Sequence, residues 1–212
     1  MTDHKRTRQA RLLQIIDVVG TFVLAIQGAS IAAEKGLDAF GIVVVSLATA
    51  TGGGIMRDVL IGESPPEALR GWPIVTAALL GAFATCFAFH IIEEIPEQVL
   101  VVVDALGLAL LAVSGTEKAL AFRLTPIAAV MMGGIAGAGG YTIRDVLLAE
   151  VPAILRVDFL ATAAIIGSIV VVIARSVKAP ANIAALLGGA TCFGLRIVAV
   201  WQHWHLPTVN LH

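Results

Sequence analysis

The chain has 212 residues, of which 58% are hydrophobic and only 14% are charged, whereas a soluble domain carries about 25% charged residues. Apolar residues are spread over the whole length, which predicts an integral membrane protein rather than a soluble domain with an anchor. The formal net charge is -1 and no basic patch with interleaved aromatic residues is present, so nucleic acid is not expected as a partner. Cys86 and Cys192 lie in apolar segments without metal-ligand spacing and are expected to pack as small residues.

Seven apolar stretches are long enough to cross a bilayer, since a spanning helix needs about 20 mostly apolar residues. The connections between them carry charge, glycine or proline, and none is long enough for a soluble domain. The predicted fold is therefore an all-α polytopic membrane protein with seven transmembrane helices, forming a single transmembrane domain over residues 1–212. The expected spans, in chain order, are 15–33, 39–61, 72–92, 99–117, 124–148, 157–176 and 181–203.

The first three spans recur in the next three. When the chain is shifted by 87 residues, the stretch 17–65 matches 104–152 at 16 of 49 positions without a gap. The matches include Asp, Arg, Glu, Pro and Gly in one register, which chance identities among Leu, Ala and Val do not easily produce. "TGGGIMRDVL" at 51–60 thus corresponds to "AGGYTIRDVL" at 138–147. The predicted units are repeat 1 at about 15–92, repeat 2 at about 99–176 and a seventh helix at about 181–203.

Each repeat holds three spans, an odd number, so the second repeat is expected to cross the membrane in the opposite sense. Transport proteins with inverted repeats place their pathway at the repeat interface, near the bilayer midplane. Of the 14 Lys and Arg residues, Lys35, Arg144 and Arg156 lie on one side of this topology, Arg196 lies within the seventh span, and the other ten lie on the side of the N-terminus. The positive-inside rule then predicts a cytoplasmic N-terminus and an external C-terminus.

Glycine clusters lie near the middle of the second and fifth spans. Gly52, Gly53 and Gly54 follow the centre of the second span, and Gly139 and Gly140 take the matching place in the fifth. An interior glycine costs a helix roughly 1 kcal/mol relative to alanine, and irregular backbone at this depth is tolerated only inside protein or beside a water-filled cavity. The clusters therefore predict two helices that bend or open around a transport pathway. The alternative is close helix packing through small residues.

Ionisable residues inside a membrane usually face the protein interior or a cavity and find partners there. The inversion brings Asp17 to the depth of Arg57 in one leaflet and Asp104 to the depth of Arg144 in the other, so two Asp–Arg pairs are expected. These pairs either set the field at a vestibule or are structural, with arginine reaching the interface. The aspartates that follow each arginine serve as loop caps or line the pathway, and Arg196 is expected to reach Asp104 or Asp145. The candidate vestibule charges are Asp17, Arg57, Asp58, Asp104, Arg144, Asp145 and Arg196.

Several polar residues near mid-span either replace water around an ion or simply bond back to helix carbonyls. Tyr141, the chain's only tyrosine, stands where the first repeat has Gly54, and it either gates the pathway or fills space left by neighbouring glycines. The "HWH" sequence at 203–205 has no carboxylate or cysteine close by, so no metal site is expected. The remaining polar candidates for the pathway are Gln27, Ser46, Thr49, Thr51, Ser114 and Thr142.

These features resemble those of the prokaryotic relatives of the trimeric intracellular cation (TRIC) channels. The resemblance rests on the seven spans, the three-plus-three repeat, "GGGIMRD" and "GGYTIRDVLLAEVP", and it covers essentially the whole chain, including the tail "LRIVAVWQHWHLP". It implies a homotrimer in a prokaryotic plasma (inner) membrane with one ion pathway in each protomer. The resemblance also implies that glycine-kinked second and fifth helices line the pathway and that monovalent cations, chiefly potassium, pass through it. Tyr141 replaces a third glycine in the second motif, so equal bending of the two helices does not follow.

The predicted function is a passive, potassium-permeable channel, and the alternative is a secondary transporter for a small solute such as an amino acid. Inverted repeats with broken helices suit both. An enzyme is not expected, because no His-Glu-x-x-His or Gly-x-Ser-x-Gly motif is present. Apart from the permeant cation no cofactor is expected, and membrane lipid is the expected surrounding without a soluble protein partner. Leucine at Gly53 or Gly140 is expected to reduce flux while the protein stays assembled.

Overall fold

The computed structural model describes residues 2–92, 97–155 and 159–202, and the regular elements in that part of the chain are all helical. In the described residues, long helices overlap all seven stretches expected to be spans, and the first begins at Thr2 and includes the basic stretch. The crossing of the membrane by all seven stays a prediction. The short α3 and η1 were not predicted, and the "HWH" sequence lies outside the described residues. The elements are α1 (Thr2–Glu34), α2 (Ala39–Ile61), α3 (Glu67–Arg70), α4 (Trp72–Ile92), α5 (Glu97–Ala121), α6 (Pro126–Leu147), the 3-10 helix η1 (Ala153–Leu155), α7 (Leu160–Ser176) and α8 (Ala181–Trp201).

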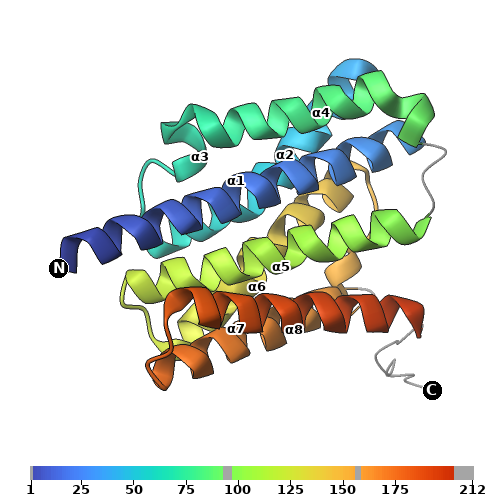
Figure 1. Cartoon of the computed structure of the whole chain (residues 1–212). Helices are drawn as coiled ribbons and strands as arrows, with labels where there is room; N and C mark the ends of the chain where they lie inside the picture. The colour runs from blue at the N-terminus through green and yellow to red at the C-terminus, as the bar shows by residue number, and fades with distance from the viewer. Residues whose placement is uncertain (1, 93–96, 156–158, 203–212) are drawn as a thin grey trace.

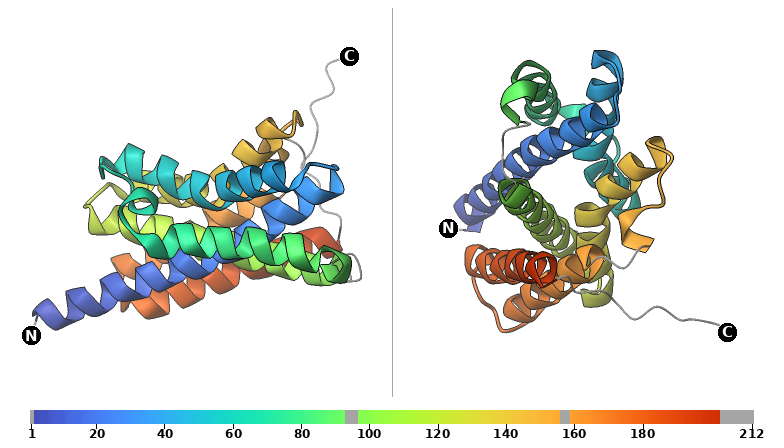
Figure 2. Two further views of the ribbon diagram at one scale, coloured as in Figure 1. Left: turned by 90° about the horizontal axis from the view of Figure 1, so that it is seen from above. Right: turned by 90° about the vertical axis from the view of Figure 1, so that its right-hand side faces the viewer.

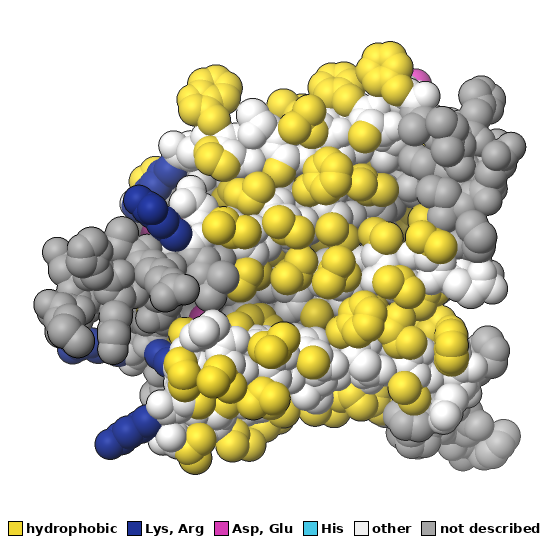
Figure 3. Space-filling view, in the orientation of Figure 1, with side chains coloured by type: hydrophobic (Ala, Val, Ile, Leu, Met, Phe, Trp, Pro, Cys, Tyr) yellow, Lys and Arg dark blue, Asp and Glu magenta, His cyan; other side chains and the backbone are white. Residues whose placement is uncertain are grey.

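The length and composition of the helices identify a multi-pass membrane protein. Helices α1, α2, α5, α6 and α8 each contain a stretch long and apolar enough to cross a bilayer. Helix α7 and the Trp72–Phe87 part of α4 are apolar but shorter. The face in Figure 3 is covered by hydrophobic side chains, and its Lys and Arg side chains gather at the end where α1 begins.

Matched local signals bound the helices of the two repeats. Asp38 caps α2 by accepting from the N–H three residues later at 2.7 Å, and Thr125 caps α6 in the same way at 3.3 Å. The chain leaves α2 and α6 through Gly62 and Ala149, which are both left-handed, with φ of 88° and 56°. In each case the two residues are 87 positions apart, so the repeat found in the sequence is also a repeat of local geometry.

Helix α5 lies at the centre of the bundle and packs against α1, α6, α7 and α8. Helix α1 packs against α2 and α4, and α2 also packs against α6. In Figure 1, α1 runs away from the N marker while α5 runs back toward that end, and Figure 2 shows α1 projecting beyond the other helices. The core draws on both repeats and is rich in small residues that let helices approach closely, among them Ala25, Ala50, Ala78, Ala109 and Ala112.

Candidate functional site

Helices α2 and α6 cross at their glycine clusters. A Cβ added to Gly53 would lie 2.3 Å from the carbonyl oxygen of Ala136, and a Cβ added to Gly140 would lie 2.0 Å from that of Thr49. Gly140 follows Gly53 by 87 residues, and Ala136 follows Thr49 by 87, so each contact is the repeat image of the other. Reciprocal contacts of this kind are typical of a two-fold relation, here between the two halves of one chain.

The predicted opening of these helices is wrong, because both α2 and α6 run unbroken through their glycines. Gly52 faces the Ile143 side chain, which a Cβ would meet at 2.5 Å, and a Cβ on Gly139 would lie 3.2 Å from Gly53 Cα. The backbones of α2 and α6 thus pack directly on each other. The absence of side chains at these glycines allows the close contact, and the hydrogen bonds within each helix are kept. Gly54 differs from its neighbours, since a Cβ there would meet nothing within 4 Å. Bending of either helix stays a prediction.

Arg57 is the centre of the first charged cluster, which consists of Asp17, Arg57, Asp58, Ser114 and Lys118. Its guanidinium donates to both carboxylate oxygens of Asp17 at 3.2 Å, to Asp58 Oδ1 at 2.8 Å and to Ser114 Oγ at 3.2 Å. The predicted pairing of Asp17 with Arg57 is therefore confirmed, and the Arg57 side chain is only 2% exposed. The cluster ties together α1, α2 and α5.

Asp58 links this cluster to the connection that follows α2. Its Oδ2 accepts the backbone N–H of Glu67, the first residue of α3, at 2.9 Å, so Asp58 acts as a loop cap. Lys118 Nζ lies 2.8 Å from Asp58 Oδ1, 2.7 Å from Glu63 Oε2 and 2.9 Å from Glu67 Oε2. Lys118, Glu63 and Glu67 were not among the site residues predicted from the sequence. A signal existed for Glu63, because its repeat position also holds a glutamate, Glu150.

The second charged cluster consists of Gln27, Asp104, Arg144, Asp145 and Arg196. Arg144 donates to Asp145 Oδ1 through Nε at 2.9 Å and Nη2 at 2.7 Å, and to Gln27 Oε1 through Nη1 at 2.8 Å. Gln27 Nε2 in turn donates to Asp104 Oδ1 at 2.8 Å. The predicted direct pair of Asp104 with Arg144 is therefore wrong, because Gln27 lies between them. Arg196 meets Asp104 Oδ2 at 3.1 Å, which confirms one of its two predicted partners.

A difference at one repeat position explains why the two clusters differ. Position 27 of the first repeat corresponds to position 114 of the second, and each arginine bonds to that position in the opposite repeat. The short Ser114 leaves Arg57 free to contact Asp17 directly. The longer Gln27 occupies the space between Arg144 and Asp104 and bonds to both. Asp145 still matches Asp58, since its Oδ2 accepts the N–H of η1 residue Ala153 at 2.8 Å.

Tyr141 fills the interior beside the second cluster. The side chain is buried, its hydroxyl donates to the Asp104 carbonyl oxygen at 3.2 Å, and its ring lies under the Arg144 guanidinium, 5.3 Å from the ring centroid. Beside the first cluster the equivalent residue is Gly54, which lines a chamber of about 20 Å³, enough for a single water molecule. The chamber walls are Asp17, Thr21, Ala50, Thr51, Gly54, Arg57, Asp58, Ala68, Ile74 and Leu111.

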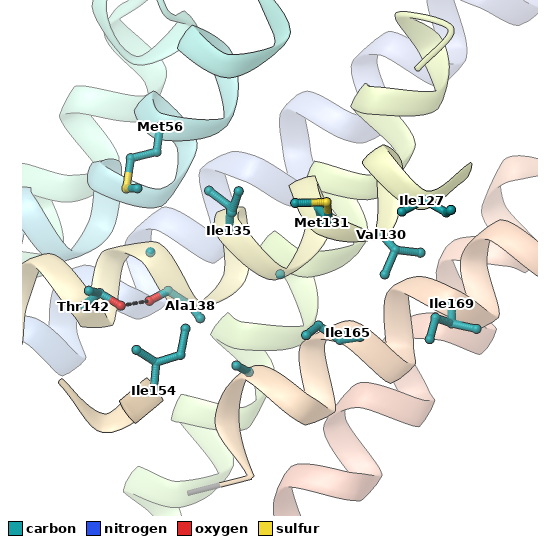
Figure 4. Close-up of a pocket in the computed structure, with 13 residues that line it drawn as sticks. Met56, Ile127, Val130, Met131, Ile135, Ala138, Thr142, Ile154, Ile165 and Ile169 are labelled. Carbon is teal, nitrogen blue, oxygen red and sulfur yellow. Dashed lines mark hydrogen bonds between the residues drawn. The ribbon is translucent and has the colours of Figure 1, made fainter. Parts of the chain in front are cut away.

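Two larger hollows lie elsewhere on the molecule. One hollow of about 320 Å³, called the mouth, is lined by residues of α1, α3, the first turn of α4 and the connection after α2, including Gln14, Glu63, Glu67 and Arg70. Figure 4 shows a groove of about 610 Å³ between α2, α6 and α7, lined by side chains such as Met56, Ile135 and Ile165. The groove lining holds no charged side chain, so the groove offers a cation no counter-charge.

The small hydroxyl groups mostly bond back to helix carbonyls, as the less specific alternative predicted. The Ser46 hydroxyl on α2 donates to the Ala25 carbonyl oxygen on α1. The hydroxyls of Thr49, Thr51 and Thr142 each donate to the carbonyl oxygen four residues earlier in the same helix. Thr51 also borders the chamber, and Thr142 borders the apolar groove.

Comparison with known protein families adds an independent view of the repeat. A family model described as "Glycine transporter" matches residues 14–90 and again residues 101–176. The two matches begin 87 residues apart, which is the shift that aligns the two repeats. The chain is also 36% identical over 201 residues to the UPF0126 inner membrane protein YadS of Escherichia coli (strain K12), covering 94% of this chain and 97% of that protein.

Two solved structures share both fold and sequence with the chain. A TRIC cation channel, studied for the structural basis of its conductance, superposes with a TM-score of 0.88 at 36% identity, covering 94% of this chain and 98% of the other. The TRIC trimeric intracellular cation channel orthologue from Rhodobacter sphaeroides superposes with a TM-score of 0.83 at 33% identity, covering 90% and 98%.

Proposed function

Because the chain belongs to the prokaryotic TRIC channel family, we propose that it is a passive channel for monovalent cations, chiefly potassium, with one pathway inside each protomer. The observation that carries the proposal is the small chamber beside Asp17 and Arg57, whose lining holds both charged and apolar residues, together with the mouth lined by Glu63 and Glu67. Acidic side chains at an entrance, here Glu63 and Glu67, favour cations over anions. The pathway runs between the two repeats, past the crossing of α2 and α6.

The alternative is a secondary transporter for a small solute such as an amino acid, and the description of the matching family model, "Glycine transporter", favours it. A transporter binds its solute near the repeat interface between broken helices. The helices of this chain are unbroken there, and the chamber of about 20 Å³ holds a water molecule or a bare ion but not an amino acid. These two features favour the channel.

A flux assay on purified protein in liposomes separates the two functions. Potassium is expected to run down its gradient without added solute, with a rate that keeps rising with concentration. Radiolabelled glycine is expected neither to enter nor to exchange. Saturable glycine exchange together with no potassium flux would replace the channel by the transporter.

We also infer the assembly and topology of the chain. A homotrimer is supported by the trimeric Rhodobacter sphaeroides orthologue, and an inner-membrane location by the Escherichia coli relative. The opposite directions of α1 and α5 and the reciprocal contacts of Gly53 and Gly140 support inverted repeats with seven crossings. The gathering of basic side chains at the start of α1 supports a cytoplasmic N-terminus. The channel relatives support a protein that is not an enzyme.

Cysteine labelling tests the inversion. Arg70 and Leu155 lie in equivalent connections and are both exposed, so single cysteines there are expected to react with an impermeant thiol reagent from opposite faces of a sealed vesicle. The background is a variant with Cys86 and Cys192 replaced by alanine. Reaction of both positions from the same face would rule out the seven-crossing topology.

Tyr141 is the expected barrier of the second repeat, because it occupies the space that Gly54 leaves open in the first. Tyr141→Ala is expected to raise potassium flux about tenfold, the change that corresponds to a barrier lowered by about 1.4 kcal/mol. Tyr141→Phe keeps the ring and loses only the hydroxyl, so its flux is expected to stay near that of the unmodified protein. If a folded Tyr141→Ala variant had the same potassium flux as the unmodified protein, Tyr141 would serve only to pack the interior.

A further inference from the structure

The chamber and the mouth of the first repeat lie one behind the other. Along α1, Gln14 lines the mouth, whereas Asp17 and Thr21 line the chamber. These residues are three and four positions apart and so follow one face of the helix. On α3, Glu67 belongs to the mouth and the next residue, Ala68, to the chamber. The two spaces therefore lead from the end of the bundle toward the first charged cluster.

One side chain borders both spaces. Among the residues that the structure describes, Ile74 in the first turn of α4 is the one that lines both the mouth and the chamber, and it is only 6% exposed. Ala68 and Leu111, which are also buried, complete an apolar wall on its chamber side. An ion that passes from the mouth to Asp17 beside Ile74 meets these apolar side chains, whereas Asp58, another chamber residue, is hydrogen-bonded to Glu67 of the mouth. Hydrophobic constrictions in channels close by excluding water.

The charged cluster holds the wall in place. Helix α3, which carries Ala68, is fixed by the bond from the Glu67 N–H to Asp58 and by the ion pair of Glu67 with Lys118. Helix α3 contacts α4, on which Ile74 lies, and is joined to it by the extended residue Gly71. Movement of this short helix would shift Ile74 relative to the chamber.

The second repeat exchanges large and small residues at the same two positions. The residue equivalent to Gly54 is Tyr141, and the residue 87 positions after Ile74, beyond the matched stretch 17–65, is Ala161. Tyr141 belongs to the packed core and Ala161 packs against that core. At these two positions the first repeat has the small Gly54 and the bulky Ile74, whereas the second has the bulky Tyr141 and the small Ala161.

We propose that Ile74 is a hydrophobic gate between the mouth and the chamber of the first repeat, so that each protomer has two barriers, Ile74 near one end and Tyr141 in the other repeat. The proposal rests on the pathway proposed above. It assigns a gating role to a side chain that carries no charge and lies outside both charged clusters.

The test measures access to the chamber independently of ion flux. Gly54→Cys puts a thiol in open space in the chamber, in the background without Cys86 and Cys192, and silver ion serves as a small, monovalent thiol probe. Protection of the thiol from later alkylation in denaturant gives the rate of silver entry. Adding Ile74→Ala is expected to raise this rate about tenfold. Ile74→Val shortens the side chain less, so its rate of silver entry is expected to lie between those of the isoleucine and alanine proteins.

Leu80→Ala is the matched control, because Leu80 lies on the same helix and is 62% exposed, so it should leave the rate unchanged. Potassium flux in liposomes is expected to rise in the same order, alanine above valine above isoleucine. Equal silver rates for isoleucine, valine and alanine at position 74 would overturn the gate. Faster silver entry with no potassium flux in any variant would keep the gate and overturn the proposed channel.

Discussion

Alanine at Gly140 is expected to force α2 and α6 apart. The added Cβ would stand 2.0 Å from the carbonyl oxygen of Thr49, a backbone atom that moves only if its helix moves. Overpacking typically costs about 1–3 kcal/mol, and a clash with backbone at a helix crossing is expected at the upper end of that range. Gly53→Ala should have a similar effect through its contact with Ala136. The measurement is the free energy of unfolding in detergent, followed by circular dichroism.

Gly54→Ala supplies the control within the same run of glycines. A Cβ there meets nothing within 4 Å, so the cost is limited to the smaller chamber, and stability should stay near that of the unmodified protein. A Gly140→Ala variant as stable as Gly54→Ala would mean that the crossing is not closely packed. The earlier expectation that leucine at Gly53 or Gly140 leaves the protein assembled is revised, because even a single methyl group clashes at both positions.

The sequence predicted the helices and the repeat because both depend on local patterns. The run of apolar residues sets each span, and Asp38 and Thr125 cap α2 and α6 at the same repeat position. The pairing of Asp17 with Arg57 was expected because the span count brings the two residues to the same depth. Each of these features follows from length, spacing and charge, which the sequence shows directly.

The details of the site were beyond such reasoning. Whether Arg144 reaches Asp104 depends on the length of the side chain at position 27, which comes from another helix. The role of the glycines was also open, because a glycine run is equally consistent with an opened helix and with a close crossing. The structure distinguishes the two through Thr49 and Ala136, whose carbonyl oxygens occupy the space where side chains would be.

Arg57→Gln is expected to cause the largest loss of stability among the charge substitutions. It leaves Asp17 buried without its cation, and breaking a buried ion pair by removing one partner costs about 3–5 kcal/mol. Adding Asp17→Asn removes the stranded charge, so the double variant should be more stable than Arg57→Gln alone. Residues in direct contact show a coupling of about 0.5–3 kcal/mol in a double-mutant cycle. Unfolding free energies of the four proteins give the coupling.

The same cycle at Arg144 and Asp104 should give a smaller coupling, because Gln27 separates them and Arg196 remains beside Asp104 after Arg144→Gln. Coupling should instead appear between Arg196→Gln and Asp104→Asn, which meet at 3.1 Å. Additive effects of the Arg57 and Asp17 substitutions on the unfolding free energy, together with strong coupling between those at Arg144 and Asp104, would contradict this reading. The direct arginine–aspartate contact would then lie in the second cluster and not in the first. The expected order follows from one difference between the repeats: serine at position 114 lets an arginine reach its aspartate, and glutamine at position 27 does not.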